Sequence, residues 1–471
     1  MKRLLLMLIC LSLWSCTFGV APLPTHPDQL QYAPLVFKVP EVDKQTLANG
    51  IRLYLKEDQE LPLVSVTAVL AGGSIGDPVD KTGLADLYAS LLRTGGAGDR
   101  SPAELDARLE YLAIDLGVSA DPYAVTLNMS LRSADLAEGL AILTDILRRP
   151  RFAPDRLELA KQQLLESIRR AKDTPSTVAH QALGAALYPE HPLGRYPTFA
   201  SVAAITRDDL RAFHRRFAAA DNLWLAVTGD FRTVQLQQTL AGLFGDWKGA
   251  GQADQPIPPL VKTPQPRLLL ATKAIPQTTI LFGETGVTKD NPDLPALKVM
   301  NYILGGGGFN SRLMREVRSN RGLAYSVYSY YQTGRRLPGQ FIAGAETKNE
   351  SVAEVVELMR RLMQQIGEEP VSAAELALAK ESLVNSFVFA FDNTHDVVTQ
   401  SLRLDFYDYP PDYLEGYRDR IAAVTIADVQ RVAKQYLQPD RQVLVLVGNP
   451  PEPAALAKSL GLRLEAIAEA P

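Results

Sequence analysis

Residues 304–331 read LGGGGFNSRLMREVRSNRGLAYSVYSYY and place a glycine run, a charged amphipathic helix and a strand directly after one another. Asn310 or Ser311 is suited to cap the helix, because short polar side chains accept hydrogen bonds from free backbone N–H groups. Gly322 is well placed to end it. Residues 323–330 then alternate with the period of a half-buried strand. The stretch therefore predicts a helix that bends straight into a strand.

Two side chains of this stretch are candidates for chemistry. Arg318 falls in the last turn of the predicted helix and Tyr325 near the start of the strand, so the bend brings their polar ends together. A guanidinium and a phenol in one place can hold a carbonyl oxygen or an oxyanion. The alternative is structural: Arg318 caps the helix C-terminus and Tyr325 is a core aromatic.

The pattern R-x-x-R-G-L-A-Y-S-V after a glycine run resembles the C-terminal half of the insulinase/pitrilysin zinc peptidases, peptidase family M16. In that family an Arg and a Tyr seven residues apart contact the substrate. The resemblance implies this role for Arg318 and Tyr325, and a substrate-binding role for Gly306, Gly307 and Gly308. It extends over residues 44–450.

Composition and charge exclude several other classes of protein. The chain has 471 residues, 46% of them hydrophobic and 22% charged, as in ordinary globular proteins, and its length favours two or more domains. A net charge of −4 gives no indication of nucleic-acid binding. Its two cysteines, Cys10 and Cys16, lie near the N-terminus. A disulfide, a cysteine zinc site and a catalytic thiol are therefore excluded in the body of the chain.

The N-terminal residues have the pattern of an export signal. Residues 1–20 combine a basic start with an apolar run that is short for a membrane span. Residues 13–16, LWSC, resemble a bacterial lipobox, which predicts lipid attachment at Cys16. The alternative is an ordinary signal peptide cleaved slightly later. Residues 21–44 follow as a Pro-rich arm, and we expect an exported, periplasmic protein, lipid-anchored to the bacterial envelope.

The chain repeats itself at a constant offset. Four pairs of matching positions are separated by 219 residues: Leu157/Leu376, Thr206/Thr425, Phe217/Tyr436 and Gly229/Gly448. This self-similarity predicts two homologous α+β halves, residues 45–248 and 267–471, joined by a Pro-rich linker at 249–266. The family resemblance implies that the two halves close like a clam shell.

The zinc motif of the family is degenerate in this chain. The family places H-x-x-E-H on the first long helix of the N-terminal half, where two imidazoles share a zinc and the glutamate activates its water. The matching positions hold Asp86, Ala89 and Ser90, and the third ligand of the family aligns with Ser167, beside Glu166. These side chains cannot replace two imidazoles and a general base. We therefore expect no metal in this chain.

The five histidines of the chain do not supply another metal site. No histidine lies between His26 and His180, so no shift of the alignment restores the motif. The later four, His180, His191, His214 and His395, share no metal-ligand spacing and are interpreted as surface or capping residues.

A lost metal site beside a retained Arg318 and Tyr325 resembles one subunit of the two-chain peptidases of the family, in which the other subunit carries zinc. The resemblance implies a zinc-bearing M16 partner, a heterodimer or dimer of heterodimers, and a peptide substrate that the Arg–Tyr pair helps to bind and stabilise. The strand near residues 113–119 resembles the edge strand on which the family binds extended peptides. The alternatives are a non-enzymatic scaffold or peptide-binding protein and, remotely, a self-sufficient peptidase with another metal site.

Overall fold

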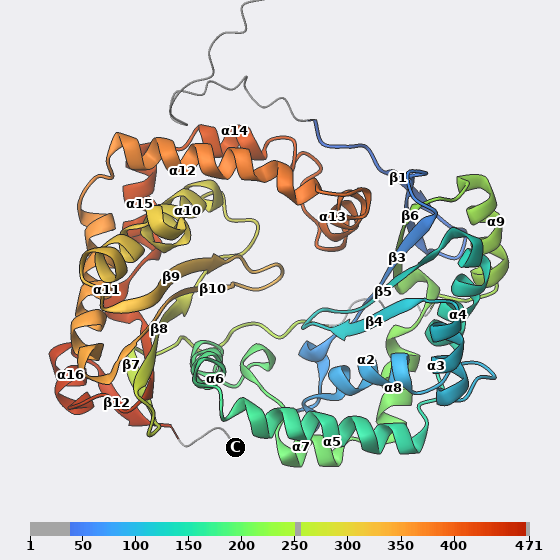
Figure 1. Cartoon of the computed structure of the whole chain (residues 1–471), viewed down its shortest axis with the longest axis horizontal. Coiled ribbons are helices and arrows are strands. Elements are labelled where there is room, and N and C mark those ends of the chain that lie inside the picture. The colour runs from blue at the N-terminus through green and yellow to red at the C-terminus, as the bar shows by residue number, and fades with distance from the viewer. Residues whose placement is uncertain (1–37, 250–255, 468–471) are drawn as a thin grey trace, which may run out of the picture. The chain divides into compact units, whose positions relative to one another are not determined.

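Two six-stranded mixed sheets form the framework of the part of the chain that the computed structural model describes, residues 38–249 and 256–467 (Figure 1). The predicted signal peptide and Cys16 lie outside the described residues. The first sheet has the order β1-β2-β6-β3-β5-β4 and the second the order β12-β7-β11-β8-β10-β9. The strands are β1 (Asp43–Thr46), β2 (Arg52–Glu57), β3 (Leu63–Ala71), β4 (Asp115–Ala120), β5 (Ala124–Arg132), β6 (Leu223–Gly229), β7 (Arg267–Thr272), β8 (Gln277–Thr285), β9 (Ala324–Gln332), β10 (Gln340–Lys348), β11 (Val443–Gly448) and β12 (Arg463–Ala466).

The two sheets share one topology. The strand pairs β2/β6 and β7/β11 are parallel, and the central strands β3 and β8 run antiparallel to both of their neighbours. The edge strands differ in origin, because β1 precedes its neighbour along the chain whereas β12 comes from the end of the described chain. This symmetry confirms the predicted α+β fold built from two homologous halves.

Helices pack on both sheets, and their bounds agree closely with the apolar periodicity of the sequence. The helices are α2 (Leu84–Thr94), α3 (Pro102–Tyr111), α4 (Leu136–Arg148), α5 (Pro154–Ala171), α6 (Pro175–Leu187), α7 (Phe199–Ala204), α8 (Arg207–Phe217), α9 (Thr233–Phe244), α10 (Leu294–Asn301), α11 (Val352–Glu368), α12 (Ala373–Ser386), α13 (Thr394–Phe406), α14 (Tyr417–Ala422), α15 (Ile426–Tyr436) and α16 (Pro453–Ser459).

Residues that match in the repeat perform matching structural tasks. Thr206 and Thr425 cap helices α8 and α15, and each accepts a hydrogen bond from the backbone N–H three residues later. Gly229 and Gly448 end the equivalent strands β6 and β11 with φ of +121° and +156°, a region that side chains disfavour. The sequence repeat is therefore a repeat of structure.

One helix of each half packs on the sheet of the other half. Helix α6, from the first half, contacts strands β8 and β11 of the second sheet. Helix α13, from the second half, contacts β2 and β6 of the first sheet. Each contact forms a hydrophobic cluster: Leu183 of α6 is buried in one, and Leu402 of α13 is buried in the other. We call α6 and α13 the exchanged helices, because each completes the core of the opposite half.

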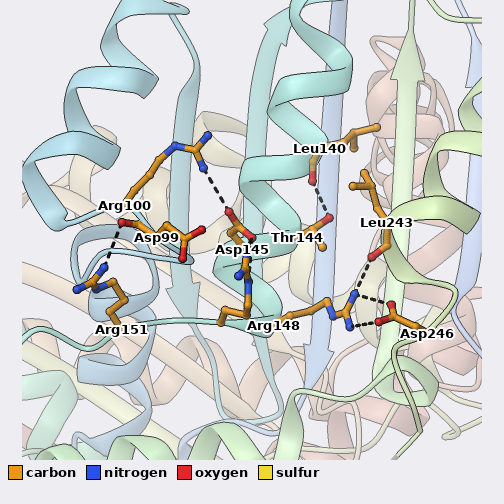
Figure 2. A network of polar contacts seen from close by, with 10 residues as sticks. Asp99, Arg100, Leu140, Thr144, Asp145, Arg148, Arg151, Leu243 and Asp246 are labelled. Atoms are coloured by element: carbon orange, nitrogen blue, oxygen red, sulfur yellow. Dashed lines mark hydrogen bonds and ion pairs between the residues drawn. The ribbon is translucent and has the colours of Figure 1, made fainter.

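Ion pairs fasten the outer helices of the first half (Figure 2). The guanidinium of Arg148, at the end of α4, donates to both carboxylate oxygens of Asp246 and to the carbonyl oxygen of Leu243 in α9. Asp145, one turn earlier on α4, accepts from Arg100 and Arg149. These contacts hold α4 against α9 and against the loop before α3.

None of the helices in the described residues is both long enough and apolar enough to cross a membrane.

Candidate functional site

The segment between the glycine run and strand β9 places the candidate arginine. Residues 312–320 are helical, and from Met314 to Asn320 the turns widen into a π-helix. The hydroxyl of Ser311 accepts a hydrogen bond from the Met314 backbone N–H at 3.4 Å, which makes Ser311 the capping residue. Gly322 has φ of +63° and its N–H donates to the Arg318 carbonyl at 2.9 Å. The predicted helix, its cap and its glycine stop are confirmed.

Arg318 and Tyr325 lie side by side. The guanidinium of Arg318 is 4.5 Å from the centre of the Tyr325 ring and 4.8 Å from the centre of the Phe309 ring. Both aromatic side chains are exposed, Tyr325 by 81% and Phe309 by 67%. Stacking on aromatic faces leaves the N–H edges of a guanidinium available to a ligand. The exposed rings thus hold a half-buried guanidinium whose N–H groups can donate to a ligand.

The structural alternative for this pair is wrong. Tyr325 is not a core aromatic, because most of its surface is exposed. Within the described part of the chain, neither the guanidinium of Arg318 nor the hydroxyl of Tyr325 has a hydrogen bond or ion pair. The side chain of Arg318 therefore does not cap a helix end. No fold contact seen here accounts for either polar group.

The glycine run packs next to this site. Helix α10 ends in a π-helical turn at Tyr302–Gly306. A side chain at Gly305 would meet Ser329 of β9 at 2.5 Å, and one at Gly307 would meet Tyr302 at 2.7 Å. Gly308 has φ of +56° and turns the chain toward Phe309. The absence of a side chain at Gly305 thus allows close packing against β9, and its absence at Gly307 allows close packing against Tyr302.

The degenerate metal positions lie on helix α2 in the first half. Ala89 is buried in the core, while Asp86 is accessible to solvent and faces a hollow between helices. The surrounding protein raises the pKa of the Asp86 carboxyl by desolvation. Ser90, a half-buried residue one turn later, accepts through its carbonyl from Thr94.

Helix α5 brings the predicted third position to the same place. Ser167 lines the hollow with Asp86, whereas the neighbouring Glu166 pairs with Arg169 and Arg170 on the surface of α5. The register that aligned the third ligand of the family with Ser167 therefore matches the packing of α2 and α5.

The side chains at this place do not fit a zinc ion. A catalytic zinc takes three protein ligands, usually imidazoles and a carboxylate, and keeps one open position. At the metal positions of the family, the hollow offers one carboxylate, that of Asp86, and one hydroxyl, and the Ser167 hydroxyl already donates to the Leu164 carbonyl at 2.8 Å. Within residues 38–249 and 256–467 no three His, Cys, Asp or Glu side chains are grouped to hold a metal.

The histidines of the described chain have structural partners. His180 contacts the Ser176 carbonyl at 2.7 Å, and His191 accepts from the Leu193 N–H at 3.2 Å and so caps a short turn. Burial lowers the pKa of His214 to about 4, and its ring contacts the Tyr88 hydroxyl at 2.9 Å. Of these three, His191 fits the capping interpretation, whereas His180 bonds to a carbonyl within its own helix α6.

His395 departs from the interpretation as a surface residue. Its two ring nitrogens contact the hydroxyls of Thr67 and Thr228 at 2.9 and 2.8 Å, and burial lowers its pKa. It lies on the exchanged helix α13 against the first sheet. His395 and His214 are therefore packing residues rather than surface residues.

Strand β4 is at the edge of the first sheet, as its sequence predicts. Among the described strands it pairs with β5 alone, so its other edge has no partner strand in this part of the chain. Strand β9, which carries Tyr325, holds the same edge position in the second sheet. An unpaired edge is a template on which an extended peptide can add a strand.

Two family models match the chain. The one described as insulinase (peptidase family M16) matches residues 52–198, and the one described as the peptidase M16 inactive domain matches residues 204–383. The chain belongs to peptidase family M16, as its sequence motifs predict.

Individual relatives agree with this assignment. An uncharacterized zinc protease of Mycobacterium leprae is 26% identical over 84% of this chain and 89% of its own length. The non-peptidase homolog YmxG of Helicobacter pylori is 25% identical over 84% of this chain and 91% of its own. The crystal structure of a peptidase M16 inactive domain from Pseudomonas fluorescens superposes with a TM-score of 0.78, at 27% identity, over 87% of this chain and 98% of that one.

Phe309 and the hollow beside Asp86 were not identified from the sequence. The only signal for Phe309 is an aromatic residue directly after four glycines, outside the apolar stripe of the helix. The hollow leaves no signal, since it depends on how α2, α5 and α6 pack.

Proposed function

We propose that this chain is the zinc-less subunit of an M16-type zinc metallopeptidase, in which Arg318 and Tyr325 act on a peptide held with a zinc-bearing partner subunit. The observation that carries the proposal is the half-buried Arg318 guanidinium, which contacts the rings of Tyr325 and Phe309 and has no hydrogen bond to the described residues. The side chains at the metal positions, Asp86, Ala89 and Ser90, support assigning the zinc to the partner.

The chemistry of the pair suits stabilisation of charge. Attack on a peptide carbonyl places negative charge on its oxygen, and fixed donors lower the energy of that state. The guanidinium of Arg318 supplies several N–H groups in one plane, and Tyr325 supplies an O–H. The two rings hold the guanidinium in place before substrate arrives, so little reorganisation is needed. The partner supplies the zinc-activated water.

A second candidate function is a scaffold or peptide-binding protein of the cell envelope. The degenerate metal positions and the relative named a non-peptidase homolog favour it. Under this function the edge strands β4 and β9 take up an extended peptide and no bond is broken. Arg318 then contributes to affinity instead of turnover.

We further propose that the chain is exported and held at the membrane through lipid on Cys16. The support is the apolar run that ends in LWSC and the Pro-rich arm after it. Replacement of Cys16 by Ala is expected to move the protein from the membrane fraction to the soluble fraction, or to block its processing. Unchanged fractionation and processing of that variant contradict the lipid.

Reconstitution tests the catalytic proposal. The chain is mixed with an M16 subunit that bears an intact H-x-x-E-H motif, and cleavage of a fluorogenic peptide is followed. We expect no cleavage by this chain alone, cleavage by the complex, and a loss of ~10²-fold or more with Arg318→Ala. The matched control is Arg315→Ala, because Arg315 lies on the same segment and its one ion pair is with Glu316 at 3.4 Å.

Two results contradict the proposal. One is a zinc held stoichiometrically by this chain together with cleavage in the absence of a partner. The other is full activity of a complex that contains the Arg318→Ala chain.

A further inference from the structure

The hollow beside Asp86 is a cavity of about 610 Å³, within the range of small-ligand sites. Helices α2 and α5 of the first half form one side, and the exchanged helix α6 forms another. Residues of the second sheet, among them Leu269 on β7 and Ile467 just after β12, complete it. The cavity thus occupies the place of the lost metal site and reaches the second half.

The walls of the cavity are mainly apolar. Leu164 and Ile168 of α5 face it together with Leu269. Helix α6 presents small side chains here, including Ala182 and Ala185, and these leave the space open. A bulky apolar group placed inside gains stability by leaving water.

Among the described residues, Asp86 is the charged group of this cavity that has no counter-ion. On the opposite wall Arg267 and Glu465 pair with each other, with nitrogen and oxygen 3.5 Å apart. The nearby Asp77 is satisfied by the backbone N–H groups of Gly83 and Ala85, at 2.9 and 3.2 Å. Asp86 makes no hydrogen bond or ion pair within the described residues.

Asp86 is accessible to solvent, and an apolar ligand that enters the cavity displaces this water, so a ligand cation that donates hydrogen bonds stabilises the carboxylate most. The side-chain amide of Gln181 also lines the cavity and has no hydrogen bond to another described residue. An amide offers both a donor and an acceptor, which matches a peptide group. The cavity therefore combines an anion, an amide and apolar walls.

We propose that this cavity binds the amino-terminal end of a short apolar peptide. The α-ammonium group contacts Asp86, the first peptide group contacts Gln181, and the first side chain packs against Leu164, Ile168 and Leu269. This site is independent of the proposed function, because it requires neither a zinc-bearing partner nor Arg318 and Tyr325.

Calorimetric titration of the mature chain tests the site with three probes. They are the peptide Leu-Leu-Gly-amide with a free amino end, the same peptide with an acetylated amino end, and n-octylammonium. We expect the free peptide to bind at one site per chain and acetylation to weaken binding about tenfold or more. If n-octylammonium binds and the free peptide does not, the assignment to a peptide is overturned.

Variants locate the binding. Asp86→Asn is expected to weaken the free peptide about tenfold and to leave the acetylated peptide unchanged, because both changes remove the same contact. Ala182→Phe fills the cavity and is expected to abolish binding of the free peptide, with a thermal melt to confirm folding. Asp80→Asn is the matched control, because Asp80 is an exposed carboxylate outside the cavity.

Three results refute the site. They are the absence of saturable binding by the free peptide, equal binding of the free and acetylated peptides, and unchanged binding by a folded Asp86→Asn or Ala182→Phe chain. None of these measurements involves peptide cleavage, so the outcome is separate from that of the proposed function.

Discussion

Arg312 and Arg318 belong to the same helical segment but have opposite surroundings. The Arg312 guanidinium donates to both carboxylate oxygens of Glu375, at 2.8 and 3.0 Å, and only 13% of its side chain is exposed. Arg318 lies between Phe309 and Tyr325 and donates to no side chain among the described residues. Arg312 thus holds its segment against helix α12, whereas the N–H groups of Arg318 make no hydrogen bond to a described residue.

The difference separates two uses of the same residue type. A bidentate arginine pair contributes to stability and specifies how two elements pack. A stacked guanidinium without hydrogen bonds contributes little to the fold and is ready to bind an anion or a carbonyl. Substitutions at the two positions should therefore affect different measurements, stability at Arg312 and turnover at Arg318.

The largest expected effect on stability is that of Arg312→Ala. We expect the free energy of unfolding to fall by about 2–3 kcal/mol, because two charge-assisted hydrogen bonds to Glu375 are lost. The activity per folded molecule of the reconstituted complex should stay the same. Chemical denaturation beside rate measurements checks both points, and the comparison fails if turnover falls at unchanged stability.

A smaller effect is expected from pH. The Arg312 guanidinium lowers the pKa of Glu375 from 4.5 to about 2. The unfolded chain then binds this proton more readily than the folded one, so the stabilisation is fully present above about pH 4.5 and is lost as pH falls toward 2. We expect a contribution of about 1–2 kcal/mol after allowance for solvent screening.

Glu375→Gln isolates that contribution. Between pH 4.5 and 2, the free energy of unfolding of this variant should decrease less than that of the unaltered chain. Denaturation curves at several pH values, compared with those of the unaltered chain, measure it. If the free energy of unfolding depends on pH identically in the two proteins, the electrostatic role assigned to the Arg312–Glu375 pair is contradicted.

The smallest expected effect is that of Phe309→Ala. It removes one of the two rings that hold Arg318 and leaves the charge in place. A cation–π contact at an exposed site is worth ~0.5–1 kcal/mol, so turnover of the complex should fall about two- to fivefold. The melting temperature should not change, since Phe309 is largely exposed. A loss as large as that of Arg318→Ala indicates a direct role for Phe309.

Much of the fold could be predicted from local sequence signals. Helix α5 follows from the proline at its start and its apolar spacing, and strand β3 from a run rich in β-branched and apolar residues. Thr206 and Thr425 marked equivalent helix starts, which revealed the repeat. These features depend on short-range patterns, which a sequence shows directly.

The remaining features depend on contacts between distant parts of the chain. The apolar stripe of α6 does not indicate that this helix covers the sheet of the other half, because either sheet offers a suitable apolar face. The Arg318–Tyr325 pair was predicted from its spacing and its resemblance to the family. The π-helical turns near Gly306 and Met314, which help to position Arg318, leave no periodic signal.

The most direct test of the central claim is Tyr325→Phe in the reconstituted complex. The change removes one hydroxyl from a ring that is 81% exposed and keeps the stacking surface for Arg318. Thermal melts and peptide-cleavage rates are measured on the same preparations, with Tyr111→Phe as control because Tyr111 is 76% exposed and lies in the other half. We predict that turnover falls ~10²–10³-fold while the melting temperature is unchanged. Full turnover from a stably folded Tyr325→Phe complex, or a loss of activity that only follows a loss of folded protein, contradicts the account.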